Sequence, residues 1–268
     1  MATFPSKPVT PDTLFYTAST TKSFTAAAVS LLIDKAANSS LRDALSWGTP
    51  LAELIREDFV LPDEYTTLHA TLEDALSHRT GMPRHDFTYG GPNVTVRDVV
   101  QNLRHLPMTA EIRTRWQYCN MMYITISHFI QTWTGIGLGD FLRTRIYEPL
   151  GMNRTFFSLA EAQAAASAGG PDLATPYYWK NYTQKYHSLP WLDSSQEYVP
   201  YVLSTIFCPM QTFDRLFYWL FLLLSQNASS HTNDFSSRTI LIHRVCPDLV
   251  PEPQSPMSLT TPNGSVAT

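Results

Sequence analysis

Apolar residues recur at helical spacing in several separate stretches of this 268-residue chain. In the stretch that begins at Thr21, Phe24, Ala28 and Leu32 share one face of a segment with high helix propensity. Capping residues and Gly or Pro bound the other periodic stretches. The predicted helices are 21–35, 71–76, 95–103, 120–133 and 138–146, and residues 160–168 are predicted as a small-residue helix or linker.

The pattern changes beyond residue 168. Residues 171–200 are rich in aromatic residues and proline, have little periodicity, and are predicted to form a loop that faces a substrate. The apolar run 216–224 has about half of the roughly 20 residues that a membrane-spanning helix needs, so we expect a buried or lid-like helix there. A strand-like run at 239–242 and a Pro- and Ser-rich tail from residue 247, expected to be disordered, follow.

Composition and charge narrow the range of functions. Apolar residues make up 44% of the chain, enough for a sizeable core. With 19 basic and 23 acidic side chains, the chain has no broad basic face for nucleic acid. Neither a signal peptide nor a membrane span is visible, so we expect a cytoplasmic protein without a membrane partner. The cysteines fit neither a disulfide framework nor a zinc pattern, and no metal is expected; they are Cys119, Cys208 and Cys246.

The first candidate for chemistry is the pair Ser19 and Lys22. Serine is a poor nucleophile at pH 7 and needs a neighbouring base. If a helix begins near Ser19, the two side chains lie three residues apart on one face, and the helix N-terminus adds positive potential. Lys22 could then serve as a base or proton shuttle. The alternative is that Ser19 caps the helix and Lys22 is a solvated lysine of its first turn.

The second candidate is the pair Tyr118 and Asn120. Because one residue separates them, both side chains point the same way in an extended segment, and Cys119 points away. A tyrosine near a lysine can act as a base, and an asparagine amide can hold a substrate carbonyl or order the lysine. The alternative is a core tyrosine and an asparagine that caps a helix beginning at Met121.

Four segments, in this order, resemble the serine β-lactamase and penicillin-binding-protein superfamily. Residues 17–25 and the Ala/Leu helix after them resemble its nucleophile helix, and residues 76–83 resemble its "LLSHTSGLP" turn. Residues 118–123 resemble its "YSNxxY" element, and residues 148–156 its "PLGMxxT" element.

The resemblance implies an α+β fold of the β-lactamase/transpeptidase type, here mostly the helical part with an incomplete antiparallel sheet. Residues 1–158 would form the catalytic region, 159–246 a divergent region of aromatic loop and helix in the same domain, and 247–268 a disordered tail. Family members usually have strands before the nucleophile helix, whereas only 18 residues precede Ser19.

Family members also carry a third motif, Lys-Thr-Gly or His-x-Gly, on a late strand that lines the oxyanion side of the site. The sequence contains no such triplet. Residues 243–245 follow the strand-like run, but they lack the glycine that lets a strand approach a substrate closely.

The function implied by the resemblance is attack by Ser19 on an ester, amide or thioester carbonyl, which forms an acyl-enzyme. Lys22 and Tyr118 would share the proton transfers, Asn120 would position the acyl group, and the partner would be a small-molecule acyl substrate without a cofactor. A hydrolase and an acyltransferase of secondary metabolism both stay open, as does a catalytically inactive, truncated member with a binding role or no independent role. The oligomeric state is also open.

Two further groups of side chains have a functional and an ordinary interpretation. Charged loop residues either line the cleft or are simply solvated; they are Arg79, Arg84, His85 and Asp86. Aromatic residues of the later loop either wall an acyl pocket or cover the core; they are Tyr177, Tyr178, Trp179 and Trp191.

Overall fold

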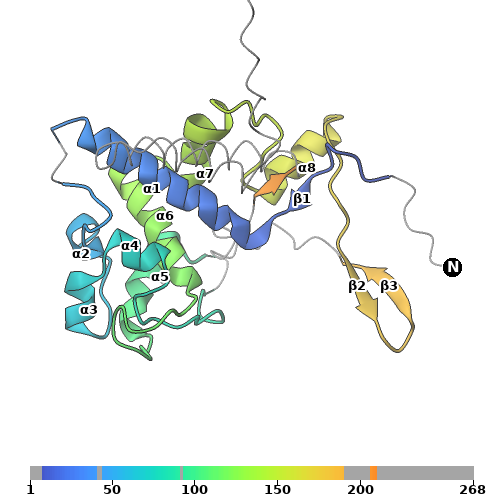
Figure 1. Ribbon diagram of the computed structural model, residues 1–268. Coiled ribbons are helices and arrows are strands. Elements are labelled where there is room, and N and C mark those ends of the chain that lie inside the picture. Colours follow the sequence, from blue (N-terminus) through green and yellow to red (C-terminus); the bar gives the residue numbers. More distant parts are fainter. Residues whose placement is uncertain (1–7, 41–43, 91–92, 190–205, 210–268) are drawn as a thin grey trace, which may run out of the picture. The chain divides into compact units, whose positions relative to one another are not determined.

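Two long helices, α1 (Thr21–Ala37) and α6 (Asn120–Thr134), lie against each other in the computed structural model (Figure 1). The structure describes residues 8–40, 44–90, 93–189 and 206–209. The two helices bury consecutive apolar residues, and Phe24, Met121 and Phe129 are fully buried. Helix α6 ends at Gly135, whose φ of 77° is the left-handed conformation that glycine adopts without strain.

Shorter helices surround this pair. They are α2 (Leu51–Leu54), α3 (Glu64–His69), α4 (Leu72–Leu76), α5 (Val96–Asn102), the 3-10 helix η2 (Leu103–His105), α7 (Leu138–Leu142), the π-helix η3 (Arg143–Tyr147) and α8 (Leu159–Ser167). Helices α4, α5 and α7 pack on α6. Threonine N-caps start α4 and α5, at Thr71 and Thr95, because each side chain accepts the backbone N–H three residues later.

The predicted helices agree with this arrangement to within about two residues at most of their ends. The small-residue segment after residue 159 is a helix with a capping box formed by Ser158 and Glu161. The helix predicted over 138–146 is present, and its second half has the wider turn of a π-helix. Helices α2 and α3 were missed because four and six residues are too short to show a helical repeat.

Two small antiparallel sheets complete the described residues. Strand β1 (Phe15–Tyr16) pairs with β4 (Phe207–Cys208), and β2 (Tyr177–Lys180) pairs with β3 (Lys185–Ser188) (Figure 1). The second pair corrects the prediction that 171–200 is a loop, because residues 177–188 form a hairpin. Helices together with antiparallel strands agree with the predicted α+β class. The predicted helix at 216–224, strand at 239–242 and tail lie outside the described residues, as do residues 243–245.

The short sheet β1–β4 fixes the chain immediately before α1. The Thr17 backbone N–H and hydroxyl both donate to the Ile206 carbonyl, at 3.0 and 2.8 Å. Phe207 exchanges two backbone hydrogen bonds of 2.9 Å with Phe156. Leu14, Phe207 and Leu159 form an apolar cluster beneath these strands. Ser19 therefore follows an anchored strand.

Within the described residues, every helix is too short or too polar to cross a membrane.

Candidate active site

Ser19 lies at the entrance of α1, on the one-turn 3-10 helix η1 (Ala18–Thr20) that joins β1 to α1. The Ser19 residue is exposed, and its hydroxyl does not cap the helix, because α1 has no side-chain cap at its N-terminus. One turn along, Lys22 is 7% exposed and donates from Nζ to Ser19 Oγ at 3.2 Å. Its Nζ also lies 5.0 Å and 5.2 Å from the ring centroids of Tyr118 and Tyr123. Lys22 is thus not a solvated surface lysine.

Tyr118 completes the contact from 99 residues away. Its hydroxyl lies 2.6 Å from Ser19 Oγ, a short hydrogen bond in which either oxygen could donate. The structure therefore brings Ser19, Lys22 and Tyr118 within hydrogen-bond reach, with the serine oxygen between the amine and the phenol. This is the geometry in which a hydroxyl can lose its proton to a neighbouring base.

His78 holds Tyr118 in place. Its carbonyl accepts from the Gln117 backbone N–H at 2.8 Å, and its ring Nδ1 accepts from the Cys119 N–H at 3.1 Å. The ring packs 4.6 Å from the Tyr118 ring. Burial and, secondarily, the charge of Lys22 lower the pKa of His78 to about 4. The imidazole is therefore neutral at pH 7 and can accept from the backbone.

A glycine turn brings the two segments together. Gly81 has a φ of 81°, and a Cβ on it would lie 2.1 Å from the carbonyl oxygen of Ala110. Its own carbonyl accepts from the Thr109 N–H at 3.3 Å. Next to it, the Arg79 carbonyl accepts from the Arg113 N–H at 2.7 Å. Only glycine allows this close approach with this backbone conformation.

Asn120, the fourth predicted site residue, is hydrogen-bonded to Asp86 and not to Ser19, Lys22 or Tyr118 in the described residues. It is the first residue of α6, which Cys119 precedes as the N-cap, so the helix-capping interpretation of Asn120 is wrong. Its Nδ2 donates to Asp86 at 3.1 Å. Within the described residues, no hydrogen bond joins Asn120 to the Ser19 group, and its buried Oδ1 has no partner.

Asp86 gathers three donors beside the site. Tyr89 and Arg84 donate to its carboxylate at 2.7 and 2.6 Å, in addition to Asn120. Burial alone would raise the pKa of Asp86, but the hydrogen bonds outweigh it and hold the pKa below its ordinary value. Because an ionised carboxylate only accepts, the Asn120 amide must turn its NH₂ toward it. In the sequence Asp86 is one of several loop charges, and no pattern connects it to Asn120.

Two exposed side chains flank Tyr118. The Arg84 guanidinium lies 4.7 Å from the ring centroid, and its side chain is 61% exposed. Trp116 is 68% exposed, and its ring lies 6.3 Å from that of Tyr118. Arg84 is therefore held against the site and is not merely solvated, whereas nothing in the sequence pattern distinguished Trp116.

The remaining candidates lie apart from this chemistry. Cys119 is fully buried, and burial raises its pKa to about 11, so the thiol is neither exposed nor ionised at pH 7. Tyr178 and Trp179 pack across the hairpin on His187 and Tyr186, and both are exposed, so they do not cover the core. The fourth aromatic of that group, at position 191, lies outside the described residues. In the part of the chain that the structure describes, no group of three metal-binding side chains is found.

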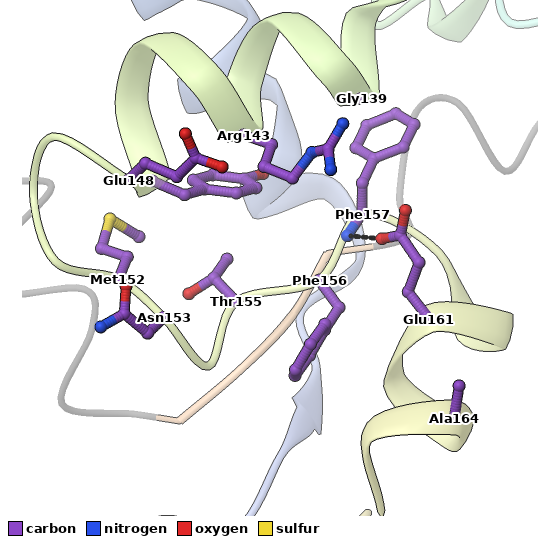
Figure 2. Close-up of a pocket in the computed structure, with 11 residues that line it drawn as sticks. Gly139, Arg143, Glu148, Met152, Asn153, Thr155, Phe156, Phe157, Glu161 and Ala164 are labelled. Carbon is purple, nitrogen blue, oxygen red and sulfur yellow. Dashed lines mark hydrogen bonds between the residues drawn. The ribbon is translucent and has the colours of Figure 1, made fainter. Parts of the chain in front are cut away.

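A cavity of about 460 Å³ lies between α7, the π-helix and α8 (Figure 2). Its lining includes Arg143, Thr155 and Phe157, and none of the four predicted site residues. The Glu161 carboxylate at its edge accepts the Phe157 backbone N–H at 3.0 Å, which is a structural contact near the start of α8. The cavity is therefore separate from the serine site.

Comparisons with known proteins identify the family of the chain. The family model for β-lactamase matches residues 2–186, and the chain belongs to this family. Two unguisins hydrolases are similar to it, ungD' of Aspergillus campestris and ungD of Aspergillus violaceofuscus. Each is 45% identical, over 71% and 68% of this chain and over 35% and 32% of the relative. The chain thus spans about a third of the length of these curated relatives.

Solved structures show the same fold. The octameric penicillin-binding protein homologue from Pyrococcus abyssi has a TM-score of 0.59 at 22% identity, over 78% of this chain and 45% of the other. The D-amino acid amidase from Ochrobactrum anthropi has a TM-score of 0.58 at 21% identity, over 81% of this chain and 57% of the other. The predicted β-lactamase/transpeptidase-like fold is confirmed.

Proposed function

We propose that this chain carries the nucleophilic serine site of an acyl hydrolase, and that Ser19 forms an acyl-enzyme with an ester, amide or thioester substrate. The observation that carries this proposal is the position of Ser19 Oγ, 2.6 Å from the Tyr118 hydroxyl and 3.2 Å from Lys22 Nζ. A serine that merely caps a helix has no need of either partner.

The order of proton transfers follows from the two contacts. In the reactive form Lys22 donates to Ser19 Oγ, and the serine donates its own proton to the Tyr118 oxygen, a direction that the contact between the two hydroxyl groups allows. Tyr118 reacts as a phenolate, with its own proton already lost to solvent and its charge stabilised by the nearby Lys22 ammonium group. As Oγ bonds to the carbonyl carbon, this phenolate takes the serine proton. The proton then passes to the leaving group, whose bond to the carbonyl carbon breaks. Water repeats the sequence to release the acid, and the Ser19 backbone N–H donates to the oxyanion.

The similarity to the two unguisins hydrolases supports hydrolysis rather than transfer of the acyl group to another acceptor. It also supports a small molecule of secondary metabolism as the substrate. The role of Asn120 in this proposal differs from the role expected from the sequence, which was to position the acyl group. Its NH₂ is held by Asp86, so it orders the wall of the site and does not directly hold the substrate carbonyl.

One observation favours the alternative of an inactive family member: the sequence lacks the third motif that lines the oxyanion side in related enzymes. Loss of one oxyanion donor typically lowers turnover on the order of 100- to 1000-fold. The two functions differ in a single property, the reactivity of Ser19.

Intact-mass analysis after incubation with a fluorophosphonate tests this property. We expect one adduct, mapped by peptide analysis to Ser19, and no adduct in Ser19→Ala. Ser23→Ala is the matched control, because the Ser23 hydroxyl lies one turn along the same helix and donates to the Thr20 carbonyl at 2.7 Å. It should label like the unmodified chain. A folded chain that is never labelled would contradict the proposal and support the inactive member.

A further inference from the structure

Arg84 presents an unused hydrogen-bonding edge at the mouth of the site. Its Nε donates to Asp86 at 2.6 Å, and its planar group lies over the Tyr118 ring. Within the described residues, neither terminal nitrogen has a hydrogen-bond partner. A guanidinium has five N–H donors, so most of those of Arg84, on a side chain that is 61% exposed, remain for a ligand.

The orientation of this edge is fixed. Tyr89 and Asn120 donate to the Asp86 carboxylate and fix its position, and the carboxylate in turn fixes the position of the Arg84 Nε. Stacking on Tyr118 constrains the guanidinium from the other direction. A cation whose geometry is set before binding loses less conformational entropy when it binds an anion.

The charges around Ser19 favour an anion. Lys22 and Arg84 are the cations that contact Tyr118, and His78 is neutral at pH 7. Asp86 already accepts three hydrogen bonds and is paired with Arg84. One aromatic ring separates the guanidinium from the hydroxyl that contacts Ser19.

We propose that Arg84 is a substrate-binding residue that takes a carboxylate of the acyl group through its terminal nitrogens while Ser19 attacks the neighbouring carbonyl. The inference rests on the proposed function and adds a substrate class to it, acyl donors with a carboxylate a few bonds from the reacting carbonyl. Two parallel N–H···O bonds from a guanidinium fit a carboxylate in shape and charge.

The test compares two activated esters that differ only in this group, the mono-p-nitrophenyl ester of glutaric acid and its methyl-capped diester. The ratio of their kcat/KM values is measured for each protein, so the neutral ester is the internal reference. We expect the unmodified chain to prefer the carboxylate by on the order of 10-fold at low ionic strength, and less in 0.5 M salt.

Arg84→Gln should bring the ratio close to one, and Arg84→Lys should keep only part of the preference because an ammonium lacks the fork. Arg145→Gln is the matched control, since Arg145 is an exposed arginine on the π-helix. It should keep the full ratio. Equal rates for both esters, or a preference that persists in Arg84→Gln, would overturn the inference alone. Absence of any Ser19 acylation would overturn the proposed function and this inference together.

Discussion

Tyr118 and Tyr123 place two phenol rings at nearly equal distances from the Lys22 ammonium group, yet their hydroxyls have different partners. The Tyr118 hydroxyl contacts Ser19, whereas the Tyr123 hydroxyl donates to the Leu76 carbonyl at 2.8 Å. Burial raises the pKa of Tyr123 to about 12, so this second phenol stays protonated. The two residues therefore form a natural pair for separating chemistry from packing.

We expect Tyr118→Phe to slow acylation of Ser19 on the order of 100- to 10,000-fold, because it removes the first proton acceptor. Tyr123→Phe should leave acylation nearly unchanged and lower the free energy of unfolding by about 1 kcal/mol, the cost of one lost hydrogen bond. Rates of fluorophosphonate labelling and urea denaturation of both variants measure the two effects. If Tyr123→Phe slowed labelling as much as Tyr118→Phe, the phenols would not have these separate roles.

Residues of the serine site differ in how far the sequence could predict them. Ser19, Lys22 and Tyr118 belong to short motifs that each had an ordinary alternative, and the resemblance of four segments to one family is what distinguished them. Asp86 and Arg84 follow a glycine turn in a stretch without periodicity, and their importance lies in contacts with residues more than 30 positions away. A local sequence pattern does not show contacts between residues so far apart in the chain.

Helices α4 and α5 start in the same way. In each, a threonine side chain accepts an N–H, and an aspartate three residues later accepts back, Asp74 in α4 and Asp98 in α5. The surroundings differ, because Asp74 is buried and also accepts from the Arg113 guanidinium at 2.8 Å, whereas Asp98 is exposed. Asp74 therefore ties α4 to the segment that leads to Tyr118.

We expect Asp74→Ala to lower the free energy of unfolding by about 3 kcal/mol, because it removes a helix cap and a charged hydrogen bond from a buried position. Asp98→Ala removes only the exposed cap and should have a smaller effect. Urea denaturation followed by circular dichroism compares the two variants. Equal losses would show that the contact with Arg113 adds nothing to the cap.

An element could be predicted when its stabilising pattern lies within its own sequence. Long helices with capping residues and glycine stops show a repeat over several turns, and α1 and α6 were predicted nearly to their ends. Helices α2 and α3 are too short for a repeat. The hairpin β2–β3 was missed because its stability comes from cross-strand pairs, such as Trp179 on Tyr186, that are not evident in one strand alone.

His78 links segments that are distant in the sequence. It follows α4, accepts a hydrogen bond from the start of α6, and packs against Tyr118 and Tyr123. Lys22 of α1 contributes to the lowered pKa of the imidazole. Three helices thus meet around one neutral histidine that is 8% exposed, so its titration bears on global stability and not only on the site.

The pKa of His78 falls from its ordinary value of 6.5 to about 4 in the folded chain. Between these two values the unfolded chain binds a proton that the folded chain does not bind, so stability decreases as the pH falls through this window. We expect the free energy of unfolding to drop on the order of 2 kcal/mol between pH 7 and pH 5. Urea denaturation at both values measures the change.

His78→Gln is the control, because a glutamine oxygen can still accept from the Cys119 N–H but does not titrate. The stability that this variant loses between pH 7 and pH 5 should be clearly smaller. The pKa of Asp58 is lowered from 3.8 to about 2, where burial opposes the shift and hydrogen bonds from His128 and Arg97 prevail, so its own contribution disappears only below about pH 4. An equal pH dependence in both proteins would mean that His78 is not the group that destabilises the fold in mild acid.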